Sequence, residues 1–300
     1  MSIPTLEELL ALRGAAHDLT LKGRRLARAS LLGAHSSPQR GRGLEFQEVR
    51  PYVAGDDPRT IDWRVTARRG RPHTKLFQEE RERPVWLLVD LQPGLFFGSR
   101  RQLKSAVAVR AAALLAWTAA LGGDRIGGVI GTGTDQRRIL PARARLAGVL
   151  PLIEALLAAQ PIAPAQPAPG TLEAILRASA SLIRPGSLVL ALSDFAAVSA
   201  QQESLWAGLA AHSDIRLYWL TDPLEAQGLP DGRFRAGLPH RLSLLDGARV
   251  RARWLAAWGE REARLMRLAQ RCSAPVARLD TSDSVESVLR PMLLRGPSAA

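Results

Sequence analysis

Five short apolar runs follow Pro84 and alternate with longer segments that have helical spacing, and this alternation limits the possible folds more than any other feature of the chain. Each run is too short for a helix, and its continuous apolar character is typical of a strand buried on both faces. The runs are Val85–Asp90, Arg125–Gly131, Ser187–Ser193, Ile215–Leu220 and Val276–Leu279. Alternation of strands and helices over this length predicts an α/β fold with a doubly wound, mostly parallel sheet.

The segments between and after these runs carry apolar residues at the three- and four-residue spacing of helices. The predicted helices are Gln102–Leu121, Ala144–Leu157, Leu172–Ile183, Glu203–His212, Ala248–Gln270 and Val285–Leu294. We also expect a short hairpin strand at Gln136–Leu140. Residues 161–170 contain four prolines and predict a stiff connector.

The first 83 residues lack this alternation. Leucines at helical spacing between Thr5 and Leu32 predict one or two helices, and we expect an amphipathic helix packed on the main domain. Residues 33–83 are polar and rich in turn residues, with short β-prone stretches that predict a β-rich insertion. We therefore divide the chain into an N-terminal region, residues 1–83, and a main α/β domain, residues 84–295.

The net charge of +13 raises the hypothesis of an arginine-rich nucleic-acid binder. However, the basic excess is spread evenly along the chain, and 38 of the 41 basic residues are arginines, which is typical of a genome-wide composition bias. The even spread argues against nucleic acid as the partner, so this hypothesis ranks third.

The expected cellular compartment of the protein is inferred from sequence features that it lacks. No stretch approaches the roughly 18 uninterrupted apolar residues of a membrane-spanning helix, and the start has no signal-peptide pattern. The single cysteine, Cys272, excludes an intramolecular disulfide and a thiolate metal cluster. We expect a cytoplasmic protein without a membrane span.

Two predicted strands end in aspartate, Asp90 and Asp194, and Thr171 begins a predicted helix. Ligands of open α/β sheets bind outside the carboxyl ends of the strands, where these three side chains would meet. Two carboxylates and a hydroxyl suit Mg²⁺, which prefers oxygen ligands. The alternative is that strand-end aspartates cap the helices that follow them, and the pattern leaves both open.

A dense charged run, residues 55–63, precedes the first strand. Paired carboxylates can serve acid–base chemistry, but the nearby arginines favour ion pairs, and we interpret the aromatic residue as an anchor beneath the loop. We expect a structural clasp or partner-binding surface, with buried Arg–Asp pairs. Its residues are Arg50, Asp56, Asp57, Arg59, Asp62, Trp63 and Arg68.

The order Asp90, Thr171, Asp194 resembles the von Willebrand factor A-type fold and its metal-ion-dependent adhesion site. That site uses Asp-x-Ser-x-Ser after the first strand, whereas Gln92 and Gly94 replace the two serines here. Gln92 still offers an amide oxygen, and Gly94 offers no side chain. The resemblance therefore implies a degenerate metal site at Asp90, Gln92, Thr171 and Asp194, with weak Mg²⁺ binding or none.

The segment from Gly43 to Arg68, which includes Gly55-Asp56-Asp57-x-Arg59-x-Ile61-Asp62-Trp63, is similar to the signature of the bacterial family called domain of unknown function 58. Genes of that family accompany MoxR-type AAA+ ATPases. The resemblance implies a non-enzymatic adaptor that acts with such an ATPase in the chaperone-like maturation of an unknown client protein. A Mg²⁺-dependent hydrolase at the strand ends is the alternative.

Overall fold

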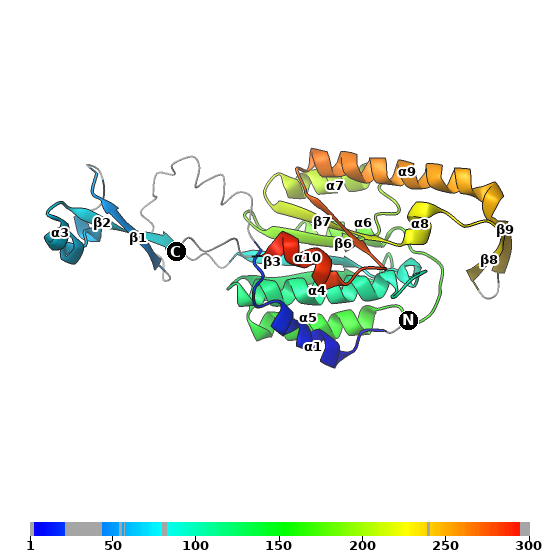
Figure 1. Cartoon of the computed structure of the whole chain (residues 1–300), viewed down its shortest axis with the longest axis horizontal. Helices are drawn as coiled ribbons and strands as arrows, with labels where there is room; N and C mark the ends of the chain where they lie inside the picture. Colours follow the sequence, from blue (N-terminus) through cyan, green and yellow to red (C-terminus); the bar gives the residue numbers. More distant parts are fainter. Residues whose placement is uncertain are drawn as a thin grey trace. The chain divides into compact units, whose positions relative to one another are not determined.

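The computed structural model describes residues 3–21, 44–53, 56, 58–79, 83–238 and 241–294. The chain divides into two compact units (Figure 1). The sheet unit comprises residues 1–28 and 83–300, and the charged unit comprises residues 29–82. The N-terminal helix falls in the sheet unit, on which we expected it to pack.

The sheet unit is built on one six-stranded sheet with the order β10-β7-β6-β3-β4-β5. Five strands are parallel, and β5 is an antiparallel edge strand paired with β4. The strand bounds are β3 Pro84–Asp90, β4 Arg125–Gly131, β5 Arg137–Ala144, β6 Leu188–Ser193, β7 Asp214–Thr221 and β10 Val276–Asp280. The α/β fold and the mostly parallel sheet predicted from the sequence are confirmed.

Strand order reverses beside β3. The chain passes from β3 to β4 on one side and then returns to β6 on the other side of β3. In open α/β sheets, such a reversal leaves a crevice at the carboxyl ends of the two diverging strands. Asp90 and Asp194 stand at that edge, directly after β3 and β6.

Helices cover both faces of the sheet (Figure 1). Successive strand residues point to opposite sides, so apolar strands present an apolar surface on each face that the helices bury. Along β3, Val85, Leu87 and Val89 belong to one hydrophobic cluster and Trp86 and Leu88 to the other. The helices of the first face are α1 Leu6–Ala15, α4 Lys104–Leu121, α5 Leu146–Ala159 and α10 Val285–Leu293. Those of the second face are α6 Thr171–Ser179, α7 Ala200–Ala210 and α9 Gly247–Arg271.

Helix α1 packs on α4 in the sheet unit. Thr5 caps its N-terminus by accepting a hydrogen bond from the Glu8 N–H, and Leu9 and Leu12 are buried. The indole Nε1 of Trp117 donates to the Leu9 carbonyl oxygen at 2.9 Å. These contacts fix the helix against the core, as expected for an amphipathic helix on the main domain.

Helix α4 is the apolar core helix of the first face. By length and composition it is the one helix among the described residues that would suffice to cross a membrane, although no uninterrupted apolar stretch in the sequence suggested a span. In the folded chain 83% of that stretch is buried inside the sheet unit. Its apolar residues therefore serve the core in this structure.

In the sheet unit, three elements were missed from the sequence. The short helix α8, Pro223–Gln227, follows β7, and the hairpin of β8, Arg233–Leu238, and β9, Arg241–Asp246, precedes α9. Strand β8 alternates arginines with other residues, the two-residue period of a half-exposed strand, whereas the predicted strands are continuous apolar runs. Asp246 then caps α9 by accepting a hydrogen bond from Arg249 N.

The charged unit, where short strands were predicted, contains an antiparallel pair of strands and a helix that was not predicted. Strand β1, Leu44–Pro51, pairs with β2, His73–Glu79, across a bulge near Phe46. Between them lies α3, Trp63–Arg69, which begins at its N-cap Asp62 and ends at Gly70 in the left-handed conformation. Glycine adopts that conformation without the steric cost that a Cβ would add.

Candidate functional site

Asp90 ends β3 with its carboxylate buried at the point where strand order reverses. Oδ2 accepts a hydrogen bond from Ser193 Oγ at 2.7 Å, and Oδ1 accepts one from Gln92 N at 3.2 Å. Burial, reinforced by the charge of Asp194, raises the pKa of the Asp90 carboxyl from 3.8 to about 7. Asp90 is therefore a buried group that titrates near neutral pH.

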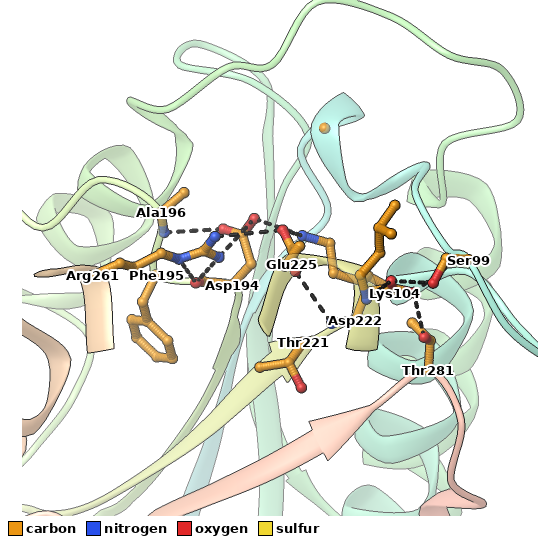
Figure 2. A network of polar contacts seen from close by, with 12 residues as sticks. Ser99, Lys104, Asp194, Phe195, Ala196, Thr221, Asp222, Glu225, Arg261 and Thr281 are labelled. Atoms are coloured by element: carbon orange, nitrogen blue, oxygen red, sulfur yellow. Dashed lines mark hydrogen bonds and ion pairs between the residues drawn. The ribbon is translucent and has the colours of Figure 1, made fainter. Parts of the chain in front are cut away.

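Asp194, directly after β6, is held by two cations. Its Oδ2 lies 3.1 Å from Lys104 Nζ and 3.3 Å from Arg261 Nη2, and its Oδ1 accepts from Ala196 N at 3.1 Å (Figure 2). Burial raises the pKa of this carboxyl, but Lys104 and Arg261 outweigh burial, so the pKa lies below its ordinary value. Asp194 is thus ionised and neutralised from within the protein.

Lys104 is the first residue of α4, and its side chain is 3% exposed. Besides Asp194, its ammonium contacts Glu225 Oε1 at 2.9 Å (Figure 2). Burial lowers the pKa of this ammonium, but the carboxylates of Asp194 and Glu225 more than compensate, so the pKa lies above its ordinary value. A buried lysine that keeps its charge in this way acts as a fixed internal cation.

Glu225 belongs to α8, where the Asp222 and Glu225 side chains form a reciprocal capping box. Asp222 also accepts hydrogen bonds from Ser99 N at 2.7 Å and from the hydroxyls of Ser99 and Thr281 (Figure 2). Burial raises the pKa of Asp222, but these hydrogen bonds from Ser99 and Thr281 hold it below its ordinary value. The capping box thus fixes Glu225 where it meets Lys104.

Arg261, on α9, completes the ion network of Lys104, Asp194, Glu225 and Arg261. Its guanidinium donates to the Asp194 backbone carbonyl, with Nε at 3.1 Å, and Nη1 lies 3.5 Å from Glu225 Oε1. Two cations and two carboxylates make the network neutral overall. It joins the starts of α4 and α8, the end of β6 and the middle of α9.

The other two predicted ligands lie at the same edge of the sheet, but their oxygens already have protein partners. Gln92 Oε1 accepts from Gly94 N at 3.1 Å and from Ala168 N at 2.8 Å. The Thr171 hydroxyl donates to the Ala168 carbonyl oxygen at 2.7 Å. Both side chains therefore anchor the proline-rich connector to the strand ends.

A divalent cation does not suit these donors. Lys104 presents its ammonium to Asp194, Gln92 uses its amide oxygen on backbone N–H groups, and Gly94 contributes no side chain. Within the described residues there is also no group of three His, Cys, Asp or Glu side chains arranged to hold a metal ion. The donor chemistry thus favours an internal cation over Mg²⁺ and gives no support to a Mg²⁺-dependent hydrolase.

Sequence reasoning brought Asp90 and Asp194 together correctly and missed Lys104 and Arg261. Lys104 carried one available signal, because it is one of only three lysines in an arginine-rich chain. Arg261 carried none, since it is one arginine among several in the α9 sequence. Only the packing of α9 beside the β6 end shows that it contacts Asp194.

The charged unit arranges the predicted clasp differently from our expectation. Arg50 Nη2 pairs with Asp56 Oδ1 at 2.7 Å, with both side chains half-buried rather than buried, and hydrogen bonds from Arg50 and Val53 N lower the pKa of Asp56. Asp62 caps α3 by accepting from the N–H groups of Arg64 and Val65.

Trp63 is not an anchor beneath the loop, because its side chain is 70% exposed at the first turn of α3. A helix that begins at Asp62 turns this residue toward solvent. Arg59 and Arg68 are also exposed, and Asp57 lies outside the described residues. Among the described residues, the predicted clasp thus contains the half-buried Arg50–Asp56 ion pair and an exposed aromatic residue.

Residues 48–236 match the family described as "Protein of unknown function DUF58", which is more than half of the chain. The chain belongs to the DUF58 family. The matched region includes most of the charged unit and the sheet unit from β3 to β8, and hence Asp90, Lys104, Asp194 and Glu225.

Curated relatives of this DUF58 protein include uncharacterized proteins of Mycobacterium bovis and Mycobacterium tuberculosis. Each is 38% identical over 132 residues, which is 44% of this chain and 41% of the relative. The match thus spans about two fifths of the length of these relatives.

Solved structures similar to this DUF58 protein include a conserved hypothetical protein BatB from Bacteroides thetaiotaomicron, with a TM-score of 0.45. Another is an aerotolerance-related membrane protein from Bacteroides fragilis, with a TM-score of 0.48. Each is 13% identical and covers 70% of this chain, and the matches include 96% and 97% of the two solved chains.

Proposed function

We propose that this DUF58 protein is a non-enzymatic adaptor that presents a client protein to a MoxR-type AAA+ ATPase for chaperone-like maturation. Its sheet unit would be a doubly wound, von Willebrand A-like domain, and the charged unit an N-terminal insertion. The strand-end site carries the proposal, because Lys104 and Arg261 already neutralise Asp194. A site satisfied by its own side chains is suited to holding a surface in shape rather than to reacting.

The exposed Trp63 supports a partner surface on the charged unit. Large aromatic residues and arginines dominate the binding energy of many protein interfaces. Trp63 is 70% exposed, and Arg64, Arg68 and Arg69 follow it on the same helix. An exposed tryptophan on a basic helix suits an acidic groove on the ATPase. We place both proteins in the cytoplasm, since the ATPase consumes ATP.

Stimulation of the ATPase tests this proposal. Addition of the purified full chain to the MoxR-type ATPase of the same organism should change its rate of ATP hydrolysis or its hexameric state. Crosslinking in native cells, followed by retrieval of the tagged chain, should recover the same ATPase. Retrieval without any AAA+ ATPase, together with an unchanged hydrolysis rate, would overturn the proposal. Trp63→Ala should abolish the effect, and Met266→Ala, which removes an exposed apolar side chain from α9, serves as the control.

A further inference from the structure

An open cavity of about 550 Å³ lies against α9 in the sheet unit, beside the loop that follows β6. Its lining residues recur along α9 at the spacing of one helical face. We call this face the α9 stripe and define it as Arg253, Trp254, Ala257, Trp258, Arg261 and Arg264. The strand-end ion network does not require the cavity, so its role is open.

The aromatic residues of the α9 stripe are held in place. Trp254 Nε1 donates to the Glu225 backbone carbonyl at 3.0 Å. Trp258 stacks on Trp219 with ring centroids 4.9 Å apart and planes inclined by 16°. Both indoles are half-buried. A ligand that packs against them therefore pays little for ordering the site, which is the benefit of preorganisation.

The arginines of the α9 stripe differ in whether they have charged partners. Arg261 is occupied by Asp194 and Glu225. Arg253 and Arg264 are exposed, and neither has a hydrogen-bond or ion-pair partner among the residues that the structure describes. Along the helix they are about 16 Å apart, at about 1.5 Å per residue. Guanidinium groups of this kind bind carboxylates in bidentate geometry.

We propose that the cavity on the α9 stripe binds an acidic peptide segment of a protein. A large apolar side chain of the segment packs on Trp254 and Ala257, and its carboxylates pair with Arg253 and Arg264. In an extended segment, about five residues span the distance between the two arginines. That the bound protein is a client of the ATPase rests on the proposed function. The binding of an acidic peptide to the cavity does not depend on it.

The net charge of the chain and the residues that line the cavity favour an acidic peptide over two other occupants. A second copy of the chain is disfavoured because each copy carries a net charge of +13. A nucleic-acid strand is disfavoured because the cavity is mainly apolar between the arginines. One face of Trp258 is also covered by Trp219, which removes a stacking platform for bases.

Fluorescence anisotropy with the full chain tests the inference. The probe is a fluorescein-labelled synthetic peptide with two Glu residues about five positions apart and a Leu between them. Arg253→Glu and Arg264→Glu should each weaken binding by about tenfold or more. Arg267→Glu, which reverses another exposed arginine of α9 without a partner among the described residues, should weaken binding less than either, because Arg267 does not line the cavity. Ala257→Trp should fill the cavity floor and abolish binding while the melting temperature stays unchanged.

Three results would overturn the inference. Equal binding of a peptide with Gln in place of Glu would remove the role of charge. Equal loss in Arg253→Glu and Arg267→Glu would show a general basic surface. Tighter binding of oligo-dT than of the peptide, lost in Arg253→Glu, would assign the cavity to nucleic acid. An ATPase effect without peptide binding refutes this inference alone, and peptide binding without an ATPase effect refutes only the proposed function.

Discussion

Lys104 and Asp194 form a buried ion pair in which Nζ lies 3.1 Å from Oδ2 and the side chains are 3% and 8% exposed. Asp194 follows β6, while Lys104 begins α4, ninety positions earlier. A charge pair taken out of water is retained only where hydrogen bonds and further charges compensate the desolvation of both ions. Glu225 and Arg261 provide that compensation here. The strand-end edge is thereby locked by charges that all belong to the chain.

Lys104→Met should lower the free energy of unfolding by about 3–5 kcal/mol, because it leaves the buried Asp194 and the half-buried Glu225 with Arg261 as their remaining cation. Urea denaturation followed by circular dichroism measures the change. Arg177→Met breaks the exposed Glu173–Arg177 pair on α6 and should cost less than about 1 kcal/mol. Equal losses in the two variants would contradict the buried network.

Asp90→Asn should change how stability depends on pH. The carboxyl keeps its proton to about pH 7 when folded and loses it near 3.8 when unfolded. The folded state therefore binds more protons between these values, and the contribution of Asp90 falls as pH rises from about 4 to about 7. Because Asn carries no charge, the variant should gain stability over the wild type across this range, by up to about 4 kcal/mol.

Thermal unfolding of both proteins between pH 4 and pH 8 measures this difference. Asp194 and Asp222 have lowered pKa values, so their stabilising contributions are lost only as pH falls below the ordinary range of a carboxyl. They are present in both proteins and cancel in the comparison. A difference that does not vary with pH would show that Asp90 is ionised throughout.

Titration with Mg²⁺ or Mn²⁺ should give no heat of binding at millimolar metal, because Lys104 already presents its ammonium to Asp194. Isothermal titration calorimetry of the wild type and of Asp90→Ala measures this. Heat in the wild type that disappears in Asp90→Ala would revive the metal site and the hydrolase hypothesis. Calmodulin serves as the positive control for the instrument and the buffer.

Trp63→Ala should leave the free energy of unfolding within about 0.5 kcal/mol of the wild type, since the side chain is 70% exposed. Asp62→Ala, by contrast, removes the N-cap of α3 and should cost about 1 kcal/mol. Chemical denaturation of both variants makes the comparison. A large loss in Trp63→Ala would mean that the indole is a packing anchor after all.

The strands were predictable because each is a run of apolar residues that a two-faced sheet must bury. Val85–Asp90 and Arg125–Gly131 were assigned within one residue of β3 and β4. The β8–β9 hairpin was missed because it is not a continuous apolar run; Arg233 and Arg235 alternate with other residues instead. Helix α3 was missed because its seven residues, three of them arginines, carry too few apolar positions to show a period.

The sequence by itself determined the α/β class, the order of the buried strands and the placement of Asp90 and Asp194 at one edge, because apolar period and chain direction are local properties. Only the tertiary structure decided what meets these carboxylates. Lys104 and Arg261 reach Asp194 from helices on opposite faces of the sheet, and side-chain contacts over such separations leave no pattern in the chain. The same packing decided that Trp63 is exposed, since a helix that begins at Asp62 sets its direction.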